Sequence, residues 1–330
     1  MSTRKKYRYK GRLDRLSDAS PAAKVSKDWG DVRDGSVYDL DPELRLSVEV
    51  ALAAKRPLLL RGDPGSGKSS LAAFIARNMR ARYYELVVTA RTSAEDVLWS
   101  FDAIRKLSDA QHPGTDVKPD GAYVEPGVLW WALDPAGAAA RTRSAPSADD
   151  PNAKRRLDAA VVLIDEIDKA DPDIPNGLLV PIGSTKFRVR ETGEVIAPDG
   201  TSGAGVEELL IVITTNETRE LPDAFVRRCV VHHVSHPGRD KLLEIARRHA
   251  RRWEPGSGAD DEELFGKVAD KLLAIREDPK RGRRKPSTAE YLDAVRAARQ
   301  LGIVVDSEEW RQLERAVLLK EPPPNGRTTS

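Results

Sequence analysis

Short, largely apolar runs recur along the first two thirds of the chain, and most of them end at a glycine or a polar residue. They cover residues 57–60, 83–89, 161–164, 209–214 and 230–234. Runs that are continuously apolar, rather than alternating with polar residues, are typical of strands buried on both faces. Because amphipathic segments separate several of these runs, the pattern predicts a parallel sheet with helices on both sides.

Helical periodicity appears between the runs and dominates the last third of the chain. We predict helices over residues 42–54 and 70–80, and a further helix that begins near Ala94 after the capping residues Thr92 and Ser93. Beyond Pro237 the predicted helices are 241–253, 261–275, 288–301 and 308–319.

Two segments between these elements have distinctive compositions. Pro, Gly, Ala, Ser and Asp dominate residues 134–153, which predicts a loop. Residues 186–195 alternate around Glu191-Thr192-Gly193-Glu194, which predicts a hairpin. A helical segment before this hairpin contains Pro181 and Gly183, and we expect these two residues to end it early.

Composition narrows the classes of protein without naming one. The 330 residues include 54 Lys and Arg against 52 Asp and Glu, a formal charge of +2. No apolar stretch approaches the roughly 20 residues of a membrane span. The single cysteine, Cys229, excludes an internal disulfide, so we expect a reducing, cytoplasmic setting. Basic residues concentrate at 4–15 and 276–285, which fits either nucleic-acid contact or, as we favour, solvated surfaces.

The strongest chemical signal is a glycine-rich octapeptide after the first apolar run. It matches G-x-x-x-x-G-K-[ST] in full and lies between a predicted strand and a predicted helix. Backbone N–H groups of such a loop point at phosphate oxygens, and the helix adds the partial positive charge of its amino end. We expect Lys68 to neutralise the β- and γ-phosphates and the Ser69 hydroxyl to bind Mg²⁺. The predicted nucleotide-binding residues are Gly62, Asp63, Pro64, Gly65, Ser66, Gly67, Lys68, Ser69 and Ser70.

Two carboxylates follow the apolar run at 161–164. A buried strand would deliver Asp165 and Glu166 to the same edge of the sheet as the glycine-rich loop. We expect Asp165 to hold Mg²⁺ and Glu166 to orient and deprotonate the attacking water. With the loop, these residues predict hydrolysis of a nucleoside triphosphate.

Further polar candidates follow the next apolar run. Asn216 is placed to hydrogen-bond the γ-phosphate or the attacking water, and Thr215 is a second choice. Arg227 and Arg228 close a short predicted helix, from which an arginine can reach the γ-phosphate of a neighbouring subunit. Solvated arginines at the carboxyl end of a helix are an equally good interpretation of their spacing.

In three ordered segments the chain resembles the AAA+ ATPases, and most closely their MoxR-type branch. RPLLLRGDPGSGKSSLA resembles the Walker A segment of that branch, and VVLIDEIDKAD resembles its Walker B segment. IVITTNETRELPDAFVRRC resembles the stretch from sensor 1 through the arginine-finger helix. The resemblance covers about residues 38–300.

This resemblance implies an α/β fold, namely a P-loop NTPase αβα sandwich with a five-stranded parallel sheet, followed by a smaller all-α lid. It also implies that ATP with Mg²⁺ is hydrolysed at subunit interfaces of a homo-oligomeric ring, usually a hexamer, with Arg227 or Arg228 acting in trans. Such proteins remodel or assemble protein partners, often with a protein bearing a von Willebrand factor A domain. Residues 121–131 and 186–197 resemble their pore-lining insertions, where Trp130 and Trp131 would either grip a substrate or pack in the core.

One departure concerns the arginine that this family often places early in a lid helix, called sensor 2. No arginine occupies the first helical turn after Ser287, so either Arg284 or Lys285 substitutes or the role is absent.

We predict a basic arm at 1–37, a nucleotide-binding domain at 38–236, a helical lid at 237–320 and a flexible tail at 321–330. Two alternative functions stay open: an AAA+ motor that acts on nucleic acid in a restriction or defence system, and a nucleotide-gated switch with little turnover.

Overall fold

A five-stranded parallel sheet forms the centre of the larger part of the protein. The computed structural model describes residues 37–112, 117–142, 150, 152–198, 205–253, 261–278 and 285–321, so nearly all of the predicted arm and tail lie outside the described residues. The strands are β1 (Leu58–Arg61), β2 (Ala81–Val87), β5 (Arg156–Asp165), β8 (Glu208–Thr215) and β9 (Val230–His233). Their order is β2-β5-β8-β1-β9, with every neighbouring pair parallel. All five predicted strands are therefore confirmed, with ends shifted by a few residues.

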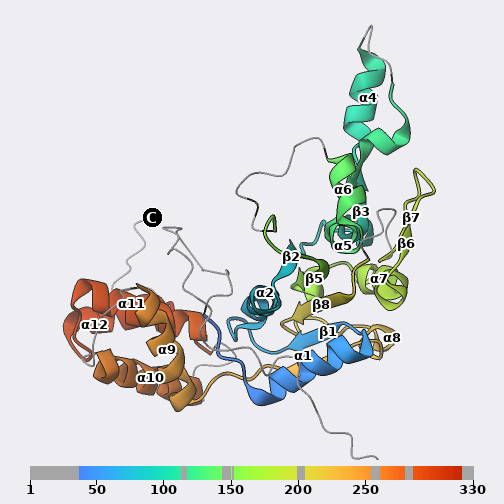
Figure 1. Cartoon of the computed structure of the whole chain (residues 1–330). Helices are drawn as coiled ribbons and strands as arrows, with labels where there is room; N and C mark the ends of the chain where they lie inside the picture. The colour runs from blue at the N-terminus through green and yellow to red at the C-terminus, as the bar shows by residue number, and fades with distance from the viewer. Residues whose placement is uncertain are drawn as a thin grey trace, which may run out of the picture.

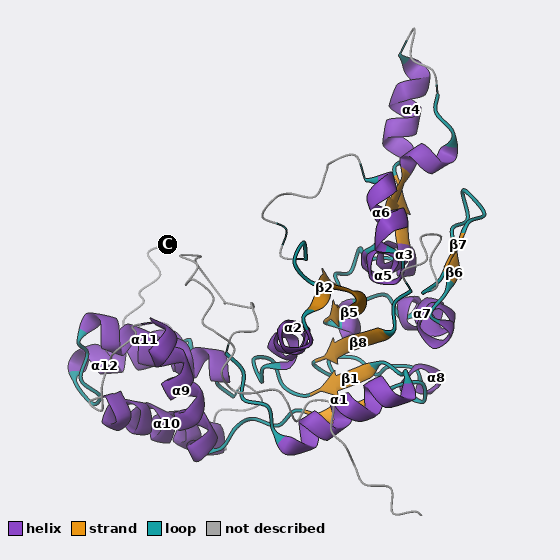
Figure 2. Cartoon of the chain, in the orientation of Figure 1, coloured by secondary structure: helices purple, strands orange, loops and turns teal. Residues whose placement is uncertain are grey.

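Helices cover both faces of this sheet (Figure 2). On β1, Leu58 and Leu60 pack on one face with α1 (Pro42–Ala54) and α2 (Lys68–Met79). Leu59 packs on the opposite face with α3 (Ala94–Leu98), α5 (Val128–Leu133) and α7 (Asp173–Ser184). Burial of successive side chains on opposite faces explains why the strands are continuously apolar.

A long insertion between β2 and β5 carries elements that the sequence analysis does not predict. An antiparallel pair, β3 (Trp99–Phe101) and β4 (Val124–Pro126), supports α4 (Ala103–Gln111) and a 3₁₀ turn at Asp120–Tyr123. Helix α4 projects well away from the sheet (Figure 1). The helix is amphipathic, but none of its residues is buried, and its apolar side chains Ile104 and Leu107 are exposed.

The prediction of a loop over residues 134–153 is wrong at its start. Residues Pro135–Arg141 form helix α6, and the Asp134 side chain caps it by accepting the N–H of Gly137. An Asp-Pro pair with alanines behind it is a good helix start, because proline suits the first helical position. Residues 143–149 and 151 lie outside the described residues.

The expectation that Pro181 and Gly183 end their helix early is also wrong. Helix α7 runs through both residues to Ser184. A proline inside a helix loses one backbone hydrogen bond. Here Pro181 and Ile182 are buried in the core, and we infer that this burial offsets the loss.

The hairpin prediction is confirmed, and at least one of the two tryptophans packs in the core. Strands β6 (Phe187–Arg188) and β7 (Val195–Ile196) pair antiparallel. Trp130 is completely buried and lies edge-to-face with Phe187, whereas Trp131 is half-buried. These positions argue against Trp130 as a side chain that grips a substrate.

The last third of the chain forms a helical region with a hydrophobic core of its own (Figure 1). It contains α9 (Arg239–Trp253), α10 (Asp261–Glu277), α11 (Thr288–Leu301), α12 (Glu308–Leu313) and a π-helical turn at Glu314–Leu319. The four predicted helices are confirmed. Among the described residues, no helix combines the length and the apolar character needed to cross a membrane.

Candidate nucleotide-binding site

The glycine-rich loop joins β1 to α2 at the carboxyl edge of the sheet. Gly62 has φ +138°, and a Cβ at this position would lie 2.3 Å from the carbonyl oxygen of Val234. Gly65 has φ +72°, and its Cβ would lie 2.4 Å from Cβ of Ser287, just before α11. Only glycine combines these backbone angles with such close approaches. The loop is therefore packed between the end of β9 and the helical region.

Lys68 is the first residue of α2 and is buried beneath the loop, 5% exposed. Its ammonium donates to the carbonyl oxygens of Gly62 and Asp63, both at 2.8 Å, and to Oδ1 of Asn216 at 2.9 Å. Burial lowers the pKa of Lys68, and the carboxylates around it, Asp165 foremost, act in the opposite direction. Lys68 and Asn216, each predicted separately as a site residue, are thus in direct contact.

The predicted metal-binding residues also meet. The Ser69 hydroxyl donates to Oδ1 of Asp165 at 2.7 Å, and the Thr214 hydroxyl donates to the same oxygen at 2.5 Å. Asp165 is 3% exposed and ends β5, next to the end of β8. A serine hydroxyl beside a buried carboxylate is an oxygen donor set that suits Mg²⁺.

Glu166 follows Asp165 in the left-handed backbone region, with φ +61°. Its N–H donates to the Thr214 hydroxyl at 2.9 Å, which fixes the backbone at this point. Oε1 accepts from Nδ2 of Asn216 at 3.4 Å, and Oε2 accepts from Nζ of Lys169 at 2.5 Å. The predicted base and the predicted sensor are therefore hydrogen-bonded to each other.

Asp168 has a structural role here that sequence reasoning missed. Its buried carboxylate accepts the N–H of Asn216 at 3.3 Å and the N–H and hydroxyl of Thr218 at 3.1 and 2.5 Å. Burial acts to raise the pKa of Asp168, but the hydrogen bonds from Thr218 and Asn216 outweigh it and the pKa lies below its ordinary value. Asp168 thereby holds the loop that carries Asn216.

The second-choice residue, Thr215, does not belong to the site. Its hydroxyl accepts the N–H of Glu217 at 3.0 Å, and its side chain does not line the cavity. By contrast, the neighbouring Thr214 reaches Asp165. Strand pleating explains this difference, because successive side chains point to opposite faces.

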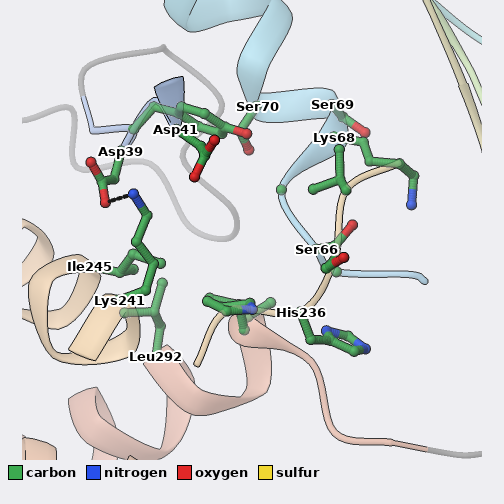
Figure 3. Close-up of a pocket in the computed structure, with 18 of the residues that line it drawn as sticks. Asp39, Asp41, Ser66, Lys68, Ser69, Ser70, His236, Lys241, Ile245 and Leu292 are labelled. Atoms are coloured by element: carbon green, nitrogen blue, oxygen red, sulfur yellow. Dashed lines mark ion pairs between the residues drawn. The ribbon is translucent and has the colours of Figure 1, made fainter. Parts of the chain in front are cut away.

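A cavity of about 680 Å³ opens beside the loop, between the sheet and the helical region (Figure 3). Lys68, Ser69, Asp165, Glu166 and Asn216 line it, together with residues of α9 and α11. Its size is in the range of small-molecule and cofactor sites.

The polar groups around the cavity fit a phosphate ligand. The hydroxyls of Ser66 and Thr288 are buried, and neither has a hydrogen-bond partner among the described residues. Buried hydroxyls normally have partners, so these two donors are available for an oxygen-rich ligand. One lies on the loop and the other at the amino end of α11, where the Thr288 N–H donates to the Gly65 carbonyl at 3.3 Å.

The helical region supplies no arginine at the expected sensor 2 position. Ser287 caps α11, and Ala289 occupies the first turn of that helix at the cavity wall. Lys285 is exposed and does not line the cavity, and Arg284 lies outside the described residues. His236, between β9 and α9, instead approaches the phosphate loop, with Nε2 3.1 Å from Oδ2 of Asp63.

Arg227 and Arg228 lie far from this cavity in their own chain. Both are exposed, and they precede β9, whose first residue Val230 donates its N–H to the carbonyl of Pro57 before β1. In a parallel sheet this is the edge opposite the phosphate loop. The Arg227 carbonyl accepts from Arg56 at 2.8 Å, which attaches the arginine pair to that edge.

Together, the sheet order, the phosphate loop and the paired acidic strand end define a P-loop nucleotide-binding protein. Residues 57–229 match the family described as AAA domain (dynein-related subfamily). The chain belongs to this family of AAA+ proteins, whose members generally hydrolyse ATP. The MoxR-type branch stays a prediction.

Solved structures of other proteins show a distant similarity. The RuvB Holliday junction branch migration motor of Thermotoga maritima is 15% identical, with 83% of this chain and 67% of that chain covered and a TM-score of 0.43. A candidate ATPase from Cytophaga hutchinsonii is 14% identical, with 83% and 79% covered and a TM-score of 0.38. No curated protein sequence matches the chain.

Proposed function

We propose that this chain is a MoxR-like ring ATPase that hydrolyses ATP with Mg²⁺ and uses the energy to remodel or assemble a protein partner. One observation supports the proposal most strongly. The ends of β5 and β8 and the start of α2 bring Lys68, Ser69, Asp165, Glu166 and Asn216 into one hydrogen-bonded cluster at the cavity wall.

Each of these residues has a role that its position supports. Residues 62–70 bind the phosphates through backbone N–H groups and the Lys68 ammonium. Ser69 and Asp165 hold Mg²⁺, which neutralises charge on the phosphate oxygens. Glu166 accepts the proton of the attacking water, while Asn216 orients that water or the γ-phosphate.

The position of the arginine pair supports a ring. Arg227 and Arg228 lie at the sheet edge opposite the phosphate loop, so neither reaches the nucleotide of its own chain. In a ring of identical subunits, for which we propose a hexamer, one of the two arginines would reach the γ-phosphate bound to the next subunit. There it would stabilise charge that develops during hydrolysis.

The choice of a protein partner rests on the resemblance to the MoxR-type branch and on the two insertions. A partner with a von Willebrand factor A domain and a cytoplasmic setting are parts of the same proposal. The nucleic-acid alternative rests on the basic residues at 4–15 and 276–285, many of which lie outside the described residues. No observation in the described residues favours that alternative.

The base is tested with Glu166→Gln. Turnover of ATP should fall at least about a hundredfold, because a general base contributes 10²–10⁴-fold. Binding of a fluorescent ATP analogue should persist, since the phosphate loop is unchanged. Undiminished turnover in the variant would overturn the assignment of Glu166.

The trans role is tested by mixing inactive variants. Arg227→Ala and Arg228→Ala are each combined with Lys68→Ala, which keeps its arginines but lacks the phosphate-binding lysine. In one of the two mixtures, activity above the sum of the separate proteins is expected. The control is Arg311→Ala, which removes an exposed arginine paired with Glu308 in the helical region. Mixed with Lys68→Ala, it should show no activity above the sum of the two separate proteins. Absence of recovery in both mixtures would contradict the trans role.

A further inference from the structure

The ion pair between Lys169 and Glu166 has no part in the roles described so far. Nζ of Lys169 lies 2.5 Å from Oε2 of Glu166, while Oε1 accepts from Nδ2 of Asn216 at 3.4 Å. Both carboxylate oxygens are therefore engaged by protein donors. A carboxylate that takes a proton from water has to present an oxygen to that water. The two contacts fix the direction in which the carboxylate oxygens point.

The backbone of the turn that carries these two side chains is held in place. The N–H of Glu166 donates to the Thr214 hydroxyl at 2.9 Å, and the N–H of Lys169 donates to the Glu166 carbonyl at 3.0 Å. Between them, the Asp168 carboxylate is tied to the loop of Asn216 and Thr218. A change in this turn is therefore confined to the side chains, of which Glu166 is 28% and Lys169 53% exposed.

A continuous chain of contacts connects this ion pair with the phosphate-binding lysine. Lys68 donates to Oδ1 of Asn216 at 2.9 Å, Asn216 donates to Glu166, and Lys169 donates to the other Glu166 oxygen. When a triphosphate accepts from Lys68, the Asn216 amide loses its donor and becomes free to turn. Its hydrogen bond to Oε1 of Glu166 is then weakened or lost. The ion pair with Lys169 is the contact that still restrains Glu166.

We propose that Lys169 is a positioning residue that holds Glu166 away from the attacking water, and that occupation of the phosphate site removes only the second restraint, the hydrogen bond from Asn216. This inference rests on the proposed function, in which Glu166 is the base. The ion pair between Lys169 and Glu166 is a weak restraint, because both side chains are partly exposed and such pairs contribute little in water. Its removal should accelerate turnover by about 1.5- to 5-fold.

The sign of the effect separates this role from its opposite. If Lys169 instead held Glu166 in the productive position, its removal would lower kcat. A purely structural ion pair would change the melting temperature and leave kcat and KM unaltered. The restraint alone predicts a higher kcat, a KM for ATP within about twofold, and an unchanged melting temperature.

The test compares steady-state ATP hydrolysis of the full chain in three variants. Lys169→Met keeps the aliphatic stem and removes the charge, and it should raise kcat by about 1.5- to 5-fold. Lys169→Arg keeps the charge and should behave like the wild type. Lys267→Met is the control, because Lys267 is about as exposed as Lys169 (47% against 53%) and lies 2.6 Å from its carboxylate partner Glu263 in α10, away from the cavity.

Two failures are distinguishable in this experiment. A wild-type chain that hydrolyses ATP no faster than Glu166→Gln would overturn the proposed function and this inference with it. Turnover that depends on Glu166 but is unchanged or lower in Lys169→Met would overturn the restraint alone. A rise in Lys267→Met equal to that in Lys169→Met would also overturn it, because the gain would then reflect charge and not position.

Discussion

Removal of the Asp168 carboxylate should loosen the loop that carries Asn216. The carboxylate accepts hydrogen bonds from the N–H of Asn216 and from the N–H and hydroxyl of Thr218. Hydrogen bonds to a charged group contribute about 1.5–3 kcal/mol each, which sets an upper limit near 9 kcal/mol. Because Thr218 is exposed, water replaces part of the loss, and for Asp168→Ala we expect about 2–4 kcal/mol.

The stability of this variant is measured by its melting temperature. For a domain of this size a loss of 1 kcal/mol lowers the melting temperature by roughly 2–4 °C, so Asp168→Ala should melt about 4–16 °C below the wild type. Asp168→Asn keeps one acceptor oxygen and should lose about half as much. In both variants kcat should fall more than the affinity for ATP, since Asn216 is displaced while the phosphate loop is intact.

The pH dependence provides a second test of the same contacts. The pKa of Asp168 is lowered in the folded chain, so its contribution to stability is present above the unfolded value of 3.8 and is lost as the pH falls below it. The difference in melting temperature between wild type and Asp168→Asn should therefore be constant near neutral pH and shrink below pH 3.8.

A nearby carboxylate serves as the control for Asp168. Asp171 makes one local hydrogen bond, from the N–H of Asp173 at 3.0 Å, and is exposed. Asp171→Ala should cost at most about 1 kcal/mol and leave turnover unchanged. A melting temperature of Asp168→Ala equal to that of Asp171→Ala, with normal turnover, would refute the argument.

Three further outcomes follow from the geometry. Gly62→Ala should lower stability by more than about 2 kcal/mol, measured by denaturant titration, because its Cβ would lie 2.3 Å from the Val234 carbonyl oxygen. Ser69→Ala should raise the Mg²⁺ concentration needed for half-maximal turnover while leaving the melting temperature within a few degrees, and an unchanged Mg²⁺ dependence would contradict the proposed ligand. Trp130→Ala should cost about 3–5 kcal/mol because Trp130 is fully buried, whereas Trp131→Ala should cost clearly less because Trp131 is half-buried, and equal losses would contradict this assignment.

Most of the candidate nucleotide site follows from the sequence because its signals are local. The phosphate loop needs glycines at defined positions, and its neighbours Lys68 and Ser69 are adjacent in sequence. Asp165 and Glu166 were recognisable because four apolar residues precede them and mark a buried strand. Residues that are adjacent in sequence remain adjacent in the folded chain, so such a pattern can be recognised without the structure.

The missed elements depend on contacts that no local pattern records. Helix α7 continues past Pro181, where the sequence predicts an end, and Pro181 and Ile182 are buried. The role of Asp168 depends on Thr218, which is fifty positions away in sequence and next to it in space. Sequence periodicity reports burial along one element but not which partner a polar side chain finds.

By itself, the sequence determined the parallel sheet, the phosphate loop and the identities of the residues in it, because buried strands and glycine-rich turns carry their own signatures. Only the tertiary structure decided which strand ends meet, and therefore that Asn216 bridges Lys68 and Glu166. It also decided that the arginine pair lies at the opposite edge of the sheet from the phosphate loop. The physical reason is that strand order and register arise from packing across the whole sheet, and packing brings together residues that are far apart in the chain.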